Sequence, residues 1–272
     1  MTREATVAVV LARGLGSRMQ RSDAAGLSDT QRAAAAAGLK AMIPDAAGRP
    51  FLDHVLTALA DAGIREVILV VAPDHEAIAD HFRAHPPARL VLRYAVQAEP
   101  LGTADAVLAA EEPLDGRDFL VLNADNLYPV VALRALVTLG MPGMVAFRAS
   151  ALVAQGNIPR ERVAAFAPVA FDAAHRLTVL VEKPDAATLA AFGDDPWVSM
   201  NLWRFDHRIL AACRATPRSV RGEHELPEAV RLAIADGVEF RALPLEAGVL
   251  DLSQRGDIAA VAAALADRPI AT

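Results

Sequence analysis

The sequence predicts an open α/β fold, in which a mostly parallel sheet is covered by helices on both faces. Apolar runs of strand length alternate with amphipathic stretches of helix length through the first 150 residues. The run 67–71, Val-Ile-Leu-Val-Val, is continuous and largely β-branched, which is typical of a strand buried on both faces. The 272 residues contain no evident linker or internal repeat, so we expect a single domain over 1–272.

The elements of the first 150 residues follow this alternation. Short apolar runs predict the strands, and a 3.6-residue periodicity predicts the helices, with Asp74 as the expected N-cap of the second helix. The predicted strands are 6–12, 66–72, 90–95, 119–123 and 144–148, and the predicted helices are 50–62, 74–84, 103–110 and 130–139.

Beyond residue 150 the pattern changes, and a mixed-sheet extension is predicted. Strands are expected near 163–171, 177–181, 198–205 and 239–244, and helices at 207–214, 225–236 and 257–265. Asp206 is the expected cap of the first of these helices. Ligands of open α/β sheets bind outside the carboxyl ends of the strands, so the chemistry is expected there.

Composition limits the function. The net charge of −6 argues against general nucleic-acid binding, and no apolar run approaches the length of about 20 residues that spans a bilayer. The chain runs directly into a strand pattern without the features of a secretory signal, so the cytoplasm is the expected location. The lone Cys213 is expected to be a small buried side chain. A homo-oligomer is compatible with the sequence.

Lysine is rare in this chain. Of 27 basic residues only Lys40 and Lys183 are lysines, and both stand in suggestive contexts. An ammonium is a compact point charge against a phosphate, whereas a guanidinium is a planar fork. Chance in the composition is the alternative explanation. Residues 1–41 also carry six cations against three acids, which suits a small polyanion but is equally typical of a solvated surface.

A glycine-rich segment, Gly14-Leu15-Gly16-Ser17-Arg18, follows the first predicted strand. Its backbone N–H groups could surround a phosphate, with a guanidinium beside them. The segment is not a dinucleotide fingerprint, because Met19 stands where a third glycine is required. A tight turn alone would explain the glycines, but not Arg18 followed by Lys40-Ala41-Met42-Ile43-Pro44.

The stretch Leu11-Ala12-Arg13-Gly14-Leu15-Gly16-Ser17-Arg18-Met19, followed by Lys40 to Pro44, resembles the signature of the sugar-nucleotide pyrophosphorylases, or sugar-1-phosphate nucleotidyltransferases. The resemblance implies a Rossmann-like, GT-A-like domain. In it, 1–150 would bind the nucleotide, 151–250 the sugar phosphate, and 251–272 would form a C-terminal helix. The interval 20–38 is longer than in many members, and a mobile lid and a short helix are equal expectations for it.

The same resemblance implies roles for the first residues. Arg18 would contact the phosphates that leave, and Lys40 would neutralise charge around the reacting phosphate. The nucleotide contacts implied in this segment are Leu11, Ala12, Gly14, Gly16 and Ser17.

Two acids fit a metal site. Asp125 ends a predicted buried strand, where an uncompensated carboxylate is costly without a cation or hydrogen bonds. Asp125 and Asp251 resemble the two metal carboxylates of the family, which implies Mg²⁺ as the cofactor. A helix cap or a turn residue is the alternative for either acid.

Glu182-Lys183-Pro184 resembles the family's Glu-Lys-Pro, in which Glu meets sugar hydroxyls and Lys meets the sugar phosphate; an exposed hairpin end is the alternative. Asn126 and Asn201 are implied beside the sugar, although Asn201 stands where a glycine is usual. Trp203, nearby, is expected in the core. The segment 222–226, Gly-Glu-His-Glu-Leu, resembles a helix start of the family and is assigned no chemistry.

The segment 97–103 resembles the family's base-reading segment. Contacts are implied from Gln97, Gly102 and Thr103, and they favour UTP or dTTP while leaving GTP open. In the alternative interpretation, Thr103 merely caps a helix.

The implied reaction transfers a nucleotidyl group from a nucleoside triphosphate to a sugar 1-phosphate, with Arg18, Lys40, Asp125 and Lys183 as the catalytic residues. The attacking phosphate is largely ionised at neutral pH, because its second pKa is near 6, and needs no general base. Two other hypotheses stay open: a related cytidylyl- or guanylyltransferase acting on a non-sugar phosphate, and a non-catalytic nucleotide-sugar-binding regulator. His81 and His85 have the spacing of metal ligands, but their charged neighbours indicate a solvated face.

Overall fold

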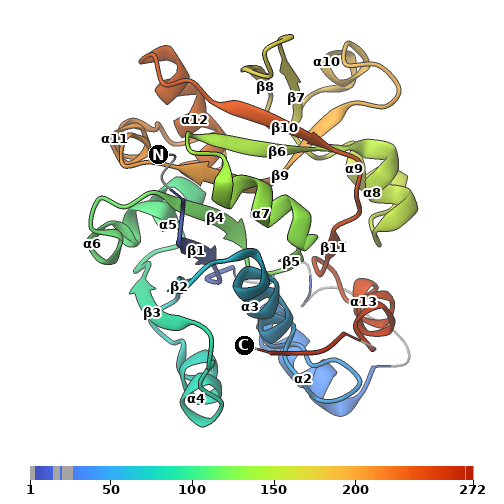
Figure 1. Ribbon diagram of the computed structural model, residues 1–272. Helices are drawn as coiled ribbons and strands as arrows, with labels where there is room; N and C mark the ends of the chain where they lie inside the picture. Colours follow the sequence, from blue (N-terminus) through green and yellow to red (C-terminus); the bar gives the residue numbers. More distant parts are fainter. Residues whose placement is uncertain (1–3, 15–18, 20–26, 267, 272) are drawn as a thin grey trace.

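A computed structural model describes residues 4–14, 19, 27–266 and 268–271 (Figure 1). Within them, one large sheet and one small sheet form. The large sheet contains β1 (Val7–Leu11), β2 (Glu66–Val71), β3 (Val91–Val96), β4 (Phe119–Asn123), β6 (Gly143–Arg148), β7 (Pro168–Phe171), β8 (Leu177–Leu180), β9 (Trp197–Phe205) and β10 (Arg241–Leu245). The small sheet pairs β5 (Asn126–Leu127) with β11 (Leu250–Asp251).

The large sheet is mostly parallel, as the sequence predicts. Its strands run in the order β10-β6-β9-β4-β1-β2-β3. β1 pairs in parallel with β2 on one side and β4 on the other, and β6 pairs in parallel with β10. β9 pairs antiparallel with β4 and β6, and it also pairs antiparallel with β7, which with β8 extends the sheet. The predicted mixed-sheet extension therefore joins the parallel strands directly.

Helices cover both faces of the sheet (Figure 1). The helices are α2 (Asp29–Ala36), α3 (Phe51–Ala62), α4 (Glu76–Ala84), α5 (Thr103–Ala109), α6 (Glu111–Leu114), α7 (Val130–Thr138), α8 (Ala149–Gln155), α9 (Arg160–Val163), α10 (Ala186–Ala190), α11 (Arg208–Ala215), α12 (Leu226–Ala235) and α13 (Asp257–Leu265), with a 3-10 turn, η1 (Lys40–Met42). Alternate residues of a strand point to opposite faces. Thus Ala8 and Val10 of β1 join one core cluster with α3 and α7, whereas Val7 and Val9 join another with α5, α11 and α12.

Some boundaries differ from the prediction. Asp74 does not cap α4, because the helix begins at Glu76 and His75 occupies the N-cap position. The strand expected at 163–171 is shortened to Pro168–Phe171, since Arg160–Val163 is helical. In the described part of 251–272, the helix is confined to Asp257–Leu265, because Asp251 belongs to β11. Asp206 likewise does not occupy the N-cap of α11, which is His207, although its carboxylate accepts a hydrogen bond of 3.0 Å from the backbone N–H of Arg208 at the start of that helix.

The interval after the glycine-rich segment contains a helix in its described part. Ser28 caps α2 by accepting from the N–H of Gln31, whose side chain accepts from the N–H of Ser28 in return. This capping box fixes the start of the helix, which ends shortly before Lys40. Residues 20–26 lie outside the described part of the chain.

His81 does not lie on a solvated face, which corrects the expectation for it. It is mostly buried, and its Nε2 lies 2.9 Å from the Asp53 carboxylate of α3, whereas His85 is exposed. Cys213 is buried, and burial raises the pKa of its thiol to about 12. Among the helices that the structure describes, none has the length and apolar character needed to cross a membrane.

Candidate active site

A cleft of about 440 Å³ opens at the carboxyl ends of β1 and β4. β1 marks the point where the chain turns from one side of the sheet to the other, because it pairs with β2 on one edge and β4 on the other. Open α/β sheets bind their ligands at this switch point, and the volume suits a small molecule. Many of the residues predicted from the sequence line the cleft: Leu11, Ala12, Gly14, Lys40, Gln97, Gly102, Thr103, Asp125 and Asn201. The predicted Gly16, Ser17 and Arg18 lie outside the described residues.

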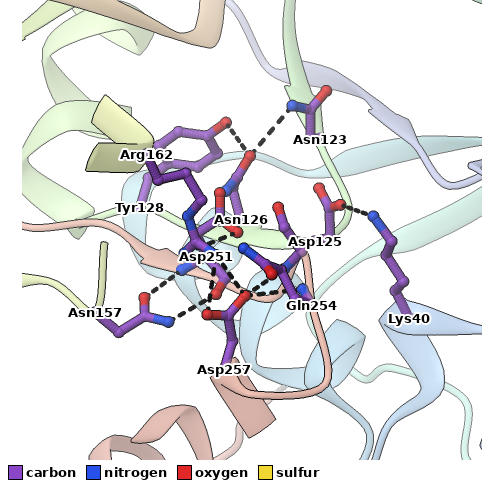
Figure 2. A network of polar contacts seen from close by, with 11 residues as sticks. Lys40, Asn123, Asp125, Asn126, Tyr128, Asn157, Arg162, Asp251, Gln254 and Asp257 are labelled. Carbon is purple, nitrogen blue, oxygen red and sulfur yellow. Dashed lines mark hydrogen bonds and ion pairs between the residues drawn. The ribbon is translucent and has the colours of Figure 1, made fainter. Parts of the chain in front are cut away.

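Lys40 and Asp125 meet on one wall of this cleft. Asp125 follows β4, whose end is fixed to β1 by a hydrogen bond of 3.1 Å from the N–H of Ala124 to the carbonyl of Leu11. Lys40 begins η1, and its Nζ donates to Asp125 Oδ2 over 3.1 Å (Figure 2). Both side chains are largely buried, so solvent screens the pair only in part.

Asp251 lies beside Asp125, although the two are far apart in the sequence. β11 pairs with β5 so that Asp251 stands opposite Asn126, and the N–H of Leu252 donates to the carbonyl of Asp125 over 2.9 Å. Asp251 is 4% exposed, and its Oδ1 is buried without a hydrogen-bond partner among the described residues. Burial, followed by repulsion from Asp125, raises the pKa of the Asp251 carboxyl against the opposing effects of Ser253 and Arg162.

The loop between α8 and α9 holds the backbone of Asp251. The Asn157 side chain donates to the carbonyl of Asp251 over 2.8 Å and accepts from its N–H over 2.7 Å. The two backbones approach closely at glycines, since a Cβ on Gly248 would lie 2.2 Å from the carbonyl oxygen of Gln155. A Cβ on Gly156 would likewise lie 2.5 Å from the carbonyl oxygen of Val249. The placement of Asp251 therefore depends on α8 and α9, two helices that the sequence did not predict.

Arg162 of α9 places a positive charge beside the segment that holds Asp251 (Figure 2). Its Nη1 donates to both carboxylate oxygens of Asp257, over 3.0 and 2.8 Å. Asp257 also accepts from the N–H groups of Ser253 and Gln254, which fixes the turn after Asp251. Asn157 and Arg162 were missed by sequence reasoning, because their partners are 94 and 95 positions away and no local pattern marks them.

The two acids are suited to a magnesium ion. Asp251 offers an unpartnered buried oxygen, and Asp125 stands on the adjacent backbone at the cleft. Within the described residues, no group of three or more His, Cys, Asp or Glu gathers as a ready-made metal site. Mg²⁺ is commonly held by one or two carboxylates together with substrate phosphates, so two acids beside a cleft open to a small molecule fit it.

Gln97 follows β3 and is oriented by acceptors. Its Nε2 donates to the carbonyl of Gly102 over 3.0 Å and to Asp105 Oδ2 over 2.7 Å. Because both partners only accept, the amide nitrogen must face them, and the carbonyl oxygen of Gln97 is left as an acceptor. Arg13 supports this segment by donating to the carbonyls of Gln97 and Ala98, over 2.7 and 3.0 Å. Its contribution was not predicted.

The segment 222–226 gains a role from its contacts. The N–H of His224 donates to the carbonyl of Leu101 over 2.6 Å, and its carbonyl accepts from the N–H of Ala104. Gly102 has a φ of +109°, and a Cβ there would lie 2.5 Å from the carbonyl oxygen of His224, so this position requires glycine. Thr103 does not cap α5, the helix that it begins. Its hydroxyl instead accepts from the N–H of Leu226, at the start of α12.

The Glu182-Lys183 pair lies outside the lining of the cleft. Both residues are exposed, and Lys183 Nζ donates to Glu225, which precedes α12. Burial alone would raise the pKa of Glu225, but hydrogen bonds from Lys183 and Arg221 outweigh it and lower the pKa. The same carboxylate thus holds two cations, which sequence reasoning did not reveal.

Two asparagines predicted beside the sugar differ in position. Asn201 lines the cleft with a φ of +56°, in the left-handed region that glycine favours and asparagine tolerates. The glycine that the resemblance implies at this position would meet the same conformational demand. Asn126 is buried, and its Oδ1 accepts from Asn123 Nδ2 and the Tyr128 hydroxyl, behind the cleft. Trp203 is fully buried, as expected.

Comparisons with known proteins agree on the class. A family model described as nucleotidyl transferase matches residues 25–266. The bifunctional protein GlmU of Azorhizobium caulinodans is 30% identical over 258 residues, which cover 90% of this chain and 50% of that protein. The chain therefore spans about half the length of this relative.

A second relative matches along most of its length. The UTP--glucose-1-phosphate uridylyltransferase AglF of Haloferax volcanii is 26% identical over 256 residues, which cover 92% of both chains. Among solved structures, the crystal structure of UDP-glucose pyrophosphorylase complexed with UDP-glucose has a TM-score of 0.75 at 15% identity. That match covers 97% of this chain and 100% of the other, and it shows a shared fold.

Proposed function

The chain belongs to the nucleotidyl transferase family, and from this premise we propose that it joins a nucleoside triphosphate to a sugar 1-phosphate. The products are a nucleotide sugar and pyrophosphate. The observation that carries the proposal is the meeting of Lys40, Asp125 and Asp251, from three distant segments, at the switch point of the sheet.

In the proposed reaction, a phosphate oxygen of the sugar 1-phosphate attacks the α-phosphorus of the triphosphate. The bond from this phosphorus to the bridging oxygen breaks, and pyrophosphate leaves with the electron pair. The attacking oxygen is already ionised, so no side chain has to remove a proton. Catalysis then rests on positioning and on charge stabilisation.

The roles follow the contacts. Lys40 neutralises charge at the α-phosphate while Asp125 keeps its ammonium in place. Asp125 and Asp251 would hold Mg²⁺, which would supply charge neutralisation at the phosphates. Lys183 and Glu182 are exposed, and in this proposal Lys183 contacts the acceptor phosphate and Glu182 the sugar. The predicted role of Arg18, at the phosphates that leave, is part of the same proposal.

The orientation of Gln97 favours a donor nucleotide whose base carries a ring N–H. Its amide nitrogen is engaged by Gly102 and Asp105, so it presents an acceptor. Uracil and thymine offer N3–H to such an acceptor, which favours UTP or dTTP as the donor. The name of the relative AglF also specifies UTP. Guanine carries a ring N–H as well, so GTP belongs in the test.

The test is a matrix of nucleoside triphosphates against sugar 1-phosphates, read by pyrophosphate release with Mg²⁺. We expect release with at least one sugar 1-phosphate and a uracil or thymine nucleotide, and loss of release in Asp125→Ala. Far-UV circular dichroism confirms that the variant is folded. If pyrophosphate were released only with non-sugar phosphates, the acceptor would belong to that class instead of the sugar 1-phosphates. Tight nucleotide-sugar binding without any release, in folded protein, would favour a regulator.

A further inference from the structure

Arg162 lies between Asp251, a proposed metal ligand, and Asp257, which holds the turn after it. Its Nη2 lies 3.6 Å from Asp251 Oδ1, while Nη1 makes both hydrogen bonds to Asp257. On the other side of the site, Lys40 lies 3.1 Å from Asp125. Each of the two proposed metal carboxylates therefore already has a protein cation beside it (Figure 2).

The contact between Arg162 and Asp251 is electrostatic without being a hydrogen bond. A separation of 3.6 Å is too long for one, and within the described part of the chain Nε and Nη2 of Arg162 and Oδ1 of Asp251 are all buried without hydrogen-bond partners. The two side chains are 11% and 6% exposed, so solvent screens their attraction weakly. Arg162 is thus held by Asp257, and its charge acts on Asp251 without occupying its oxygen.

The charges of this cluster decide what a cation would meet. Asp125, Asp251 and Asp257 supply three negative charges, and Lys40 and Arg162 supply two positive charges. The cluster has one negative charge in excess. A divalent cation alone would reverse this to an excess of one positive charge in a largely buried place, which is costly. The phosphates of a bound nucleotide would remove that excess.

We propose that Arg162 is an internal counter-ion of Asp251 that keeps the affinity of the free enzyme for divalent cations low, so that the metal binds together with the triphosphate. This inference rests on the metal site of the proposed function. Arg162 acts through Asp251 and is a positioning residue. It cannot swing away cheaply, since two hydrogen bonds to Asp257 hold its guanidinium.

The experiment measures Mn²⁺ binding to the free protein, without nucleotide, from the electron paramagnetic resonance signal of unbound Mn²⁺. We expect Arg162→Met to bind Mn²⁺ about tenfold more tightly than the unchanged protein or better, because one like charge near the cation is gone. Arg162→Lys keeps the charge and is expected to stay near the starting affinity. Arg160→Met removes an exposed arginine from the same helix and serves as the matched control.

A thermal melt of each variant confirms folding, and Arg162→Gln, which keeps an N–H toward Asp257, replaces the Met variant if that one unfolds. Unchanged or weaker Mn²⁺ binding in a folded Met or Gln variant would overturn the proposal. So would tighter binding that survives the addition of Asp251→Asn, since the cation would then lie elsewhere. Pyrophosphate release plays no part in this readout, so its outcome stays separate from that of the proposed reaction.

Discussion

The two lysines of the chain each contact a carboxylate. Lys40 donates to Asp125 inside the cleft, and Lys183 donates to Glu225 outside the lining of the cleft. Lys183 also has a φ of +50°, a conformation that a long side chain adopts rarely. Backbone strain of this kind is often found at functional positions, which supports a role for Lys183 in spite of its exposure.

We predict that Lys40→Arg lowers kcat by about 100-fold or more, the usual cost of displacing one group that stabilises transition-state charge. A planar fork carries the same charge but cannot place it at the position of the ammonium. Lys183→Arg is expected to raise the KM for the sugar 1-phosphate as well. Steady-state pyrophosphate release measures both effects.

The control for this pair is Arg93→Lys, which changes an exposed arginine paired with Glu66, outside the lining of the cleft, and should leave kcat unchanged. If both lysine variants worked at nearly the normal rate, the scarcity of lysine would be a matter of composition alone.

The raised pKa of the Asp251 carboxyl predicts how the stability of the protein changes with pH. Because its pKa is raised in the folded protein, the ionised carboxylate costs stability at pH values above the folded-state pKa. This cost disappears as the pH falls below the ordinary carboxyl pKa, where folded and unfolded chains are both protonated. Asp251→Asn is therefore expected to raise the melting temperature at pH 7 to 8, by about 2–4 °C for each kcal/mol relieved.

Melting curves from pH 4 to 8 measure this effect, and the difference between variant and starting protein should shrink toward the acid end. The same variant should bind Mg²⁺ poorly, so stability and activity move in opposite directions. A lower melting temperature at pH 8 would show that the carboxylate contributes net stability there.

Sequence reasoning found the residues that stand at strand ends and missed those that support them. Asp125 is recognisable because an acid after an apolar run is unusual, and Lys40 because lysine is rare. Asn157 and Arg162 lie in no repeating pattern, and only the folded chain brings them to Asp251 and Asp257. The prediction that His81 lies on a solvated face was wrong because it rested on local sequence. The charged neighbours of His81 in the sequence do not indicate its contact with Asp53 on α3.

At the scale of elements, α8 and α9 help to hold Asp251 in place, and the sequence pattern did not predict either helix. Both helices are short, so they lack the long periodicity that identifies helices such as α3. Their importance for the site comes from their contacts with the segment 248–251. There, the absence of side chains on Gly156 and Gly248 lets two backbones touch.

We predict that Gly248→Ala destabilises the fold by about 3 kcal/mol or more, because its Cβ would overlap the backbone of Gln155. Asp251 would lose its position at the same time, so Mg²⁺-dependent activity should fall at temperatures where the protein is still folded. Chemical denaturation and pyrophosphate release measure the two effects.

Gly256→Ala is the matched control, since a Cβ added there would meet no atom of the described residues within 4 Å, and the φ of −62° suits alanine. We expect its stability to match or slightly exceed that of the starting protein. Equal stability of the two alanine variants would contradict the close approach at Gly248.

On the scale of the whole molecule, β9 connects the two parts that the sequence distinguishes. It hydrogen-bonds to β4 of the first part and to β7 of the second, within one sheet. The core clusters on both faces of this sheet draw residues from both parts. Such sharing favours unfolding as one unit, because β9 links the parallel strands β1 to β4 with β6, β7, β8 and β10.

The chain contains two tryptophans, Trp197 and Trp203, and both belong to β9. We therefore predict that tryptophan fluorescence and far-UV circular dichroism report the same transition midpoint in urea. Circular dichroism follows the helices of both parts, whereas fluorescence follows the shared strand. Two separated midpoints would indicate that the parts unfold independently.

The position of β9 also bears on how the protein is made. A ribosome releases roughly 5–20 residues per second, and the outer edge of β4 has no partner until residue 205 has emerged. During that interval the nascent chain carries an unpaired strand edge, the kind of surface that chaperones shield. Asp251 emerges later still, so the newborn chain acquires both proposed metal carboxylates only after β9 has been made.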